Sequence, residues 1–316
     1  MIFIDSQQIK IAATYTDWID SMEKALLQDP ATDFIMPHRT HLDFENNTLL
    51  IMPCINKEYI STKLISLFPA NLDIGKPLLS GLVILNNGIT GEPLAVLDGS
   101  TITAMRTAGV GSVGVRHLSV PDVENLGIIG LGTQGIYQAI FACSERDFRR
   151  IYIFDCCKSS TDNFRSVFSP IYPHIEIIQA DDARQLCEES EVIITATNSS
   201  SPVIPDEREI LYGKTVIGIG SYKPDMREFP DTLFNMIEYM FIDTLHGMKE
   251  SGDLLEPVKK RILNQNQFIT IDKVIRGVVA PGPTSVFKTV GMALFDLYGA
   301  KLVYESIIHE HQEKLK

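Results

Sequence analysis

Apolar and polar positions alternate over the second half of the chain in a way typical of parallel strands separated by helices. Each apolar run is short enough for one buried strand, and a stretch with helical periodicity follows it. This alternation predicts a doubly wound parallel sheet with helices on both faces, the Rossmann-type α/β architecture. The predicted strands are 126–130, 151–155, 175–179, 192–197, 216–220 and 240–243.

The first 118 residues follow a different pattern. An amphipathic helix is predicted near 16–27, and short strand-like runs separated by turn sequences follow it. Such runs indicate an α+β domain built on a largely antiparallel sheet. The tail over 291–311 has strong helical character. The predicted strands are 48–52, 59–67, 81–86 and 94–98, with turns at 86–88 and 90–93.

A glycine-rich turn joins the first strand of the second half to its helix. Gly130, Gly132 and Gly135 form the pattern Gly-x-Gly-x-x-Gly. The first glycine allows a tight turn, the second lets a pyrophosphate approach the backbone, and the third lets the helix pack close to the strand. This loop, which includes Thr133 and Gln134, is therefore predicted to bind a dinucleotide at the helix N-terminus.

An acid at the end of the next strand bears on the choice of cofactor. Asp155 follows Gly130 by 25 residues, where a carboxylate bonds the ribose 2′-hydroxyl of NAD and repels the 2′-phosphate of NADP. Only Lys158 nearby could serve a phosphate, so NAD(H) is favoured over NADP(H). The ends of later strands should face the nicotinamide half of the cofactor. These residues are Thr195, Thr197, Gly220 and Ser221.

A second copy of the glycine pattern stands earlier in the chain, at Gly109, Gly111 and Gly114. The residues before it do not form a buried strand, and no strand that ends in an acid follows at the right distance. We therefore predict a helix over 101–118 whose small residues allow close packing.

The change of pattern near residue 118 predicts two domains. A chain of 316 residues is long enough for two cores, since single cores usually stop growing at roughly 250–300 residues. We expect a substrate-binding domain over 1–118, against which the helix 291–316 packs, and an NAD(P)-binding domain over 119–290. Such a pairing predicts a substrate site in the cleft between the domains.

Composition argues against several kinds of partner. The net charge of −12 and the pI near 5.1 argue against nucleic acid and acidic membrane surfaces. No signal peptide is recognisable, and no apolar run reaches the roughly 18 residues of a membrane span. Five scattered cysteines without a Cys-x-x-Cys pair fit a reducing compartment, so we expect a cytoplasmic protein. The sequence contains no recognisable metal-ligand cluster.

Three cations stand in unusual places: Arg39 in Met-Pro-His-Arg-Thr-His, Lys63 in an otherwise apolar run, and Arg106 in Thr-Ala-Met-Arg-Thr-Ala. Lysine and arginine are rarely buried unless they are paired, and the carboxylate of a substrate could supply the pair. From composition alone, surface cations whose stems cover apolar neighbours explain them equally well.

Around these cations the chain resembles the ornithine cyclodeaminase/mu-crystallin family, over nearly its whole length. Taken together, the matching motifs are highly specific. They are Arg39, 51–53, Lys63 with 69–71, 91–95 with 98–99, 103–108, the Gly130 loop, 195–197, 220–228 and 286–293.

The resemblance implies that Arg39, Lys63 and Arg106 hold the carboxylate of a small amino or imino acid. It also implies that the sheet domain pairs with its twin in a homodimer, and that the reaction passes through an imine and a hydride transfer. Two positions depart from the cyclodeaminase pattern. Leu50 replaces a glutamate, and Tyr222 aligns with the aspartate that would hold the distal amine of the substrate.

These departures favour an NAD(P)H-dependent reductase of a cyclic ketimine such as Δ1-pyrroline-2-carboxylate, run in reverse as an amino-acid dehydrogenase. Ornithine cyclisation needs acid–base groups that the two replacements remove. Lys63 is the predicted catalytic proton donor, with His41, Asp43 and Glu45 as alternatives. Ornithine cyclodeaminase itself and a mu-crystallin-like small-molecule binding protein are the two other functions to be considered.

Overall fold

The structure, a computed structural model, describes residues 1–314 and divides the chain into two compact units. Unit 1 contains residues 1–106 and those from 292 onward, and unit 2 contains Thr107–Gly291. The division falls inside helix α3 (Gly99–Leu118), whereas the sequence pattern predicts it after residue 118. A continuous helix crosses this point, so no turn or linker sequence marks it.

Unit 2 is built on an eight-stranded sheet in which every neighbouring pair is parallel. This confirms the predicted α/β class, with β8 between β9 and β11. The strand order is β10-β9-β8-β11-β12-β15-β13-β14. The strands are β8 (Asn125–Ile129), β9 (Arg150–Phe154), β10 (Glu176–Gln179), β11 (Val192–Thr195), β12 (Thr215–Gly218), β13 (Met240–Ile242), β14 (Phe268–Thr270) and β15 (Ser285–Lys288).

Two of these strands, β14 and β15, do not follow from the hydrophobic pattern. β15 has four residues, follows a Pro-Gly-Pro turn and lies between β12 and β13, out of sequence order. All four of its residues are buried because strands pair with it on both sides.

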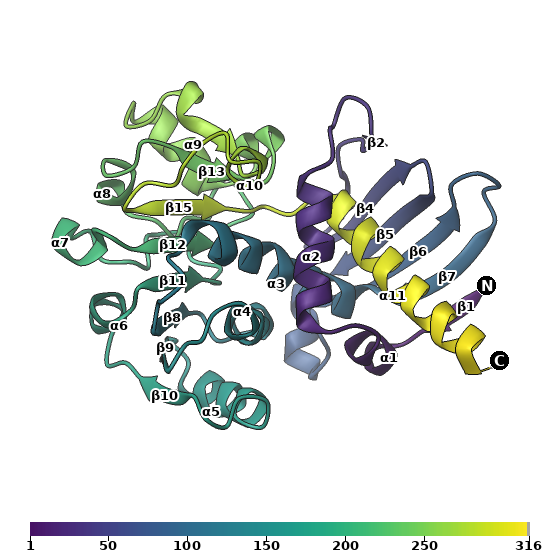
Figure 1. Cartoon of the computed structure of the whole chain (residues 1–316), viewed down its shortest axis with the longest axis horizontal. Coiled ribbons are helices and arrows are strands. Elements are labelled where there is room, and N and C mark those ends of the chain that lie inside the picture. The colour runs from purple at the N-terminus through teal and green to yellow at the C-terminus, as the bar shows by residue number, and fades with distance from the viewer. Residues whose placement is uncertain (315–316) are drawn as a thin grey trace. The chain divides into compact units, whose positions relative to one another are not determined.

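Helices cover both faces of this sheet (Figure 1). The helices α4 and α5 lie on one face and α6, α7 and α8 on the other. The earlier glycine repeat lies in α3, as predicted, and a Cβ on Gly111 would stand 2.0 Å from Gln138 Oε1 of α4. The helices are α4 (Thr133–Glu145), α5 (Lys158–Phe168), α6 (Ala183–Glu189), α7 (Arg208–Leu211), α8 (Asp231–Phe234), α9 (Gly252–Lys259) and α10 (Asp272–Ile275).

Unit 1 is a seven-stranded sheet covered by helices. The path runs β1-β7-β6-β5-β4-β2, and β3 pairs with β4; only the β1–β7 pair is parallel among these described strands. The C-terminal helix α11 packs across β4, β5 and β6 and against α2 (Figure 1). The elements are β1 (Ile2–Ile4), β2 (Phe34–Ile35), β3 (Thr40–Phe44), β4 (Asn47–Asn56), β5 (Tyr59–Leu67), β6 (Leu79–Asn87), β7 (Pro93–Asp98), α1 (Ser6–Ile11), α2 (Tyr15–Leu26) and α11 (Ala293–Lys314).

The two faces of this sheet differ in burial. Because side chains alternate along each strand, the register places buried Met52, Lys63 and Val83 in one row on the face that α11 covers. The opposite face, which we call the open face, carries apolar side chains that stay exposed. These are Phe3, Ile35, Leu42, Phe44, Ile55 and Leu82, which are between 37% and 74% exposed.

Within residues 1–314, no helix combines the length and the apolar character that a membrane crossing requires.

Candidate cofactor and substrate sites

The turn between β8 and α4 has the geometry that its glycines predict. Gly130 has φ +92°, and a Cβ on Gly135 would stand 1.9 Å from the carbonyl oxygen of Gly130. A Cβ on Gly132 would meet no atom within 4 Å, so the backbone there is open to a ligand. Gly132 is also the N-cap of α4 and offers no side-chain cap, which leaves the helix N-terminus able to bind an anion. Thr133 and Gln134 form the first turn of α4.

Asp155 lies directly after β9 and connects the glycine loop to the following turn. Its Oδ2 accepts a hydrogen bond from Leu131 N at 2.7 Å, and its Oδ1 accepts one from Cys157 N at 2.7 Å. A carboxylate has about four lone-pair sites, so both oxygens retain capacity for ribose hydroxyls. These residues therefore fit the adenosine half of a dinucleotide.

The ends of β11 and β12 differ in what they can contact. Thr195 is fully buried, whereas Thr197 and Gly220 are partly exposed. Ser221 is buried, and its hydroxyl donates to Met226 O at 2.8 Å. Thr197 and Gly220 are thus the predicted nicotinamide-side residues that a ligand could reach directly.

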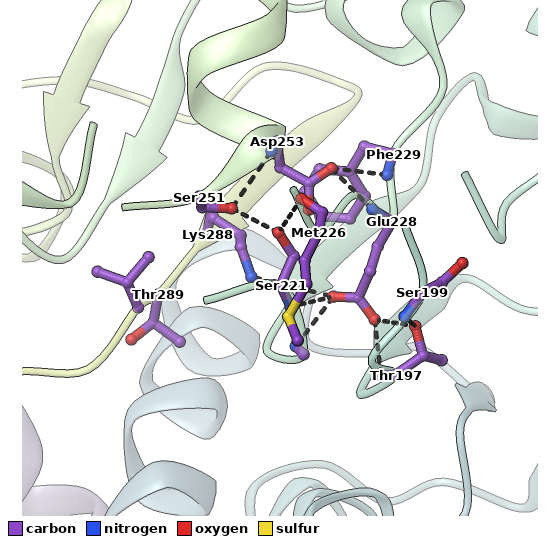
Figure 2. Close-up of polar contacts among 12 residues, drawn as sticks. Thr197, Ser199, Ser221, Met226, Glu228, Phe229, Ser251, Asp253, Lys288 and Thr289 are labelled. Atoms are coloured by element: carbon purple, nitrogen blue, oxygen red, sulfur yellow. Dashed lines mark hydrogen bonds and ion pairs between the residues drawn. The ribbon is translucent and has the colours of Figure 1, made fainter. Parts of the chain in front are cut away.

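Glu228, which the sequence reasoning did not single out, joins these two strand ends. Its Oε1 accepts hydrogen bonds from Thr197 N at 2.7 Å and from Thr197 Oγ1 at 2.8 Å. Its Oε2 accepts bonds from Gly220 N at 2.9 Å and Ser221 N at 3.1 Å (Figure 2). We call this set of four bonds the Glu228 brace. Glu228 is the last residue of the motif 220–228 that resembles the family, and this position is the signal that could have identified it.

A buried charge cluster lies behind the brace. Lys288 Nζ stands 3.9 Å from Glu228 Oε2, and both side chains are fully buried (Figure 2). Burial lowers the pKa of Lys288, and the nearby carboxylates of Glu228, Asp253 and Asp243 oppose that change. Burial likewise raises the pKa of Asp253 to about 6, although Lys288 works in the opposite direction.

In unit 1 an internal carboxylate brings two of the predicted cations together. Asp296, at the start of α11, lies 2.7 Å from Lys63 Nζ through Oδ2 and accepts a hydrogen bond from Arg106 Nε at 3.1 Å. All three side chains are less than a tenth exposed. Lys63 and Arg106 are therefore not surface cations, and they have a partner within the chain before any substrate binds.

Sequence reasoning missed Asp296. The helical pattern of 291–311 is apolar around it, and a lone carboxylate among Ala, Leu and Phe is the signal that could have found it.

Arg39 belongs to the same face of the sheet. It immediately precedes β3, and continuing the β3–β4 register places it opposite Met52, which pairs with Lys63. Burial lowers the pKa of Lys63 to about 8; Asp296 raises it, and the positive charges of Arg106 and Arg39 lower it. Lys63 and Arg106 thus share one internal carboxylate, Arg39 lies close enough to lower the pKa of Lys63, and this group of cations suits an anionic ligand.

The alternative proton donors occupy distinct positions. His41 pairs with Leu50 across β3 and β4, on the face that carries Lys63. Asp43 Oδ1 accepts a hydrogen bond from Thr48 Oγ1 at 2.7 Å, and Glu45 lies in the turn after β3 with φ +54°. Tyr222 is 40% exposed, with Lys223 Nζ 5.8 Å from its ring centroid.

Among the described residues, no group of three or more His, Cys, Asp or Glu side chains could hold a metal ion.

A parallel sheet with a glycine-rich dinucleotide turn, joined to a sheet unit that buries paired cations, defines a two-unit nucleotide-binding fold typical of dehydrogenases. The family model described as "Ornithine cyclodeaminase/mu-crystallin family" matches residues 2–311, and the chain belongs to this family.

Similar proteins include reductases of imines. A Δ1-pyrroline-2-carboxylate reductase from Bacillus cereus is 30% identical over 98% of this chain and 97% of its own length. The mouse ketimine reductase mu-crystallin is 27% identical over 86% of this chain and 83% of its own. The structure of Thermococcus litoralis Δ1-pyrroline-2-carboxylate reductase, in complex with NADH and L-proline, is 28% identical, covers 98% of both chains and has a TM-score of 0.90.

Proposed function

We propose that this chain is an NAD(P)H-dependent reductase of cyclic imino acids, such as Δ1-pyrroline-2-carboxylate, and an amino-acid dehydrogenase in reverse. The observation that carries the proposal is the buried Lys63–Asp296–Arg106 arrangement with Arg39 beside it. Asp296 contacts both Lys63 and Arg106, so one negative charge faces two positive charges and leaves positive charge for the carboxylate of a substrate. The names of the similar proteins, two of which are pyrroline-2-carboxylate reductases, support the same substrate class.

Each half of the reaction has its own residues. Arg39 and Arg106 bind the substrate carboxylate and fix its orientation, and Lys63 donates a proton to the imine nitrogen. A protonated imine accepts hydride far more readily than a neutral one, and the pKa of about 8 at Lys63 leaves the amine protonated at neutral pH yet able to release its proton. The nicotinamide, when bound to unit 2, supplies the hydride.

Two apolar or neutral positions support the reductase over ornithine cyclodeaminase. Leu50 lies on the face that carries Lys63 and offers no carboxylate to a distal ammonium. Tyr222 offers a hydroxyl and an aromatic ring in place of an aspartate. A cyclic imino acid has no distal ammonium and needs neither acid, whereas the distal ammonium of bound ornithine would be left without a counter-ion.

We further propose NADH as the preferred cofactor. Asp155 retains lone pairs for ribose hydroxyls and would repel a 2′-phosphate. The exposed Cys156 and Cys157 follow it where an NADP site usually places arginine.

A homodimer formed through unit 1 is also part of the proposal. The open face is a sheet surface of exposed apolar side chains, and such a patch is typical of a protein–protein interface. Every large apolar side chain of the sheet that is more than about a third exposed falls on this face or in a connecting turn.

The test is the loss of absorbance at 340 nm when purified protein, NADH and Δ1-pyrroline-2-carboxylate are mixed. We expect NADH oxidation with formation of proline, slower turnover with NADPH, and no proline from ornithine and NAD⁺. Proline and ammonia from ornithine would instead establish the cyclodeaminase. Binding of NADH with no turnover of any imine would favour a binding protein.

A further inference from the structure

We propose that Glu228 is a positioning residue for the nicotinamide half of the cofactor, acting by holding the ends of β11 and β12 together. This proposal rests on the proposed function only in requiring a nicotinamide dinucleotide as the cofactor.

The Glu228 brace gives one carboxylate oxygen to each strand end. Oε1 receives both donors of Thr197, after β11, and Oε2 receives the backbone N–H groups of Gly220 and Ser221, after β12 (Figure 2). Each of these N–H and O–H groups donates its hydrogen bond to a carboxylate oxygen, which can only accept. This fold binds the reacting half of its ligand at the ends of the central parallel strands. The brace therefore fixes the backbone that would lie beneath the nicotinamide.

The two strand ends approach each other as closely as backbone allows. A Cβ on Gly220 would stand 1.9 Å from Thr197 O and 2.7 Å from Glu228 Oε1. At this separation no side chain fits between the end of β12 and the end of β11. The carboxylate of Glu228 therefore links the ends of β11 and β12, which are already in contact.

Buried residues of other segments hold Glu228 in place. Asp253 Oδ1 accepts hydrogen bonds from Glu228 N and Phe229 N, both at 2.9 Å. The Lys288 ammonium, 3.9 Å from Oε2, provides the opposite charge within a fully buried environment. Ser221 and Ser251 share a 2.5 Å hydrogen bond that joins the β12 end to the same support (Figure 2). The brace is thus fixed before any cofactor binds.

The experiment compares two ligands that share an adenosine half. ADP-ribose would bind through the Gly130 loop and Asp155 alone, whereas NADH would also use the region of the brace. The affinities of both are measured by calorimetry for wild type, Glu228→Gln and the matched control Asp225→Asn, an exposed acid-to-amide change on the same segment.

The amide of the Glu228→Gln variant must turn its NH₂ group toward a backbone N–H that meets an oxygen in the wild type, so at least one hydrogen bond of the brace is lost. We expect NADH affinity to fall about tenfold to 100-fold in this variant, the range for a hydrogen bond to a charged group. The affinity for ADP-ribose should stay within about twofold, and Asp225→Asn should bind both ligands as wild type does.

Equal losses for the two ligands, or no loss of NADH affinity, would overturn the proposal, because a general loss of structure moves both affinities together. Should Glu228→Gln fail to fold, Glu228→Asp keeps the charge near Lys288 and withdraws the carboxylate by one methylene, and the same selective loss is expected. These measurements need no imine. If the imine assay failed but Glu228→Gln still lost affinity for NADH and not for ADP-ribose, the proposed function would be contradicted and the proposal for Glu228 would not.

Discussion

Asp296 sets the local charge around Lys63 and Arg106, two residues proposed to bind the substrate. A single carboxylate lies between Lys63 and Arg106, and without it two buried cations would face each other with no counter-ion. Asp296 raises the pKa of Lys63, opposing both burial and the neighbouring arginines. The carboxylate thereby favours the protonated form of Lys63, which is the form that the proposed proton donation requires.

The pH dependence of the reaction should report this balance. If protonated Lys63 is the donor, kcat/KM for the imine loses about tenfold per pH unit above the Lys63 pKa of about 8. In Asp296→Asn the contribution that raises this pKa is removed, so the break should move to lower pH. Steady-state kinetics with saturating NADH from about pH 6 to about pH 10 measure both profiles.

The comparison between the two profiles removes the titration of the imine itself, which is the same in each. Asp73→Asn, an exposed acid-to-amide change in the same unit, should keep the wild-type profile. A break that stays at one pH in all three proteins would mean that Lys63 is not the group that titrates.

Sequence reasoning reached some residues of the site and not others, for a physical reason. Gly130, Asp155 and Lys63 belong to local patterns: a glycine repeat, an acid that ends a strand, and a cation in an apolar strand. Asp296 has its role only through contacts with residues far away in sequence, 190 positions in the case of Arg106. Glu228 contacts Gly220 only 8 positions away, but its other oxygen contacts Thr197, 31 positions away at the end of a different strand. No local pattern specifies such a partner.

At the scale of elements, the alternation of side chains along each strand gives the sheet of unit 1 two different faces, one proposed for the substrate and one proposed for the dimer. One face carries Lys63 beneath α11, and the open face carries Leu82, Phe44 and Phe3. A one-residue slip in register would exchange the two sets, so the pairing of β4, β5 and β6 must be strictly held.

We expect the open face to form the homodimer, and Leu82→Glu to disrupt it. Leu82 is 48% exposed in the single chain, and a charge buried there in a dimer would lack a partner. Sedimentation equilibrium should give twice the 35.3 kDa chain mass for wild type and a mass near 35.3 kDa for the variant.

Ile89→Glu is the matched control, since Ile89 is 85% exposed but lies in the turn between β6 and β7. It should sediment as wild type does. A Leu82→Glu protein that keeps the doubled mass would show that another surface makes the dimer.

Hydrophobic periodicity predicts some helices and strands of this chain and not others. Amphipathic helices and strands with a clear apolar run, such as α2, β5 and β8, follow directly from their hydrophobic spacing, and so do the short strands β10 to β13. The strands β1, β2, β3, β14 and β15 are not predicted; β3 has five residues but all of them are exposed, and the other four strands have two to four residues each. β15 gains its place from pairing with β12 and β13, which is a property of the assembled sheet.

For the whole molecule, the residues proposed to bind the cofactor all belong to unit 2. A ligand at about 100 times its Kd adds about 2.7 kcal/mol to the free energy of unfolding, provided that it binds only the folded state. We expect NADH at such a concentration to raise the midpoint of thermal unfolding. Differential scanning calorimetry measures this shift.

NADPH at the same concentration should raise the midpoint less, because Asp155 opposes a 2′-phosphate. Equal shifts with the two cofactors would contradict the role assigned to Asp155.

The path of the chain through its two units has a consequence for biosynthesis. Unit 2 ends at Gly291, and Asp296 follows it. A ribosome has therefore translated every residue assigned to the cofactor before it reaches the counter-ion of Lys63 and Arg106, which were made long before. A nascent chain can complete unit 2 first, while Lys63 and Arg106 acquire their buried carboxylate only when the last helix emerges.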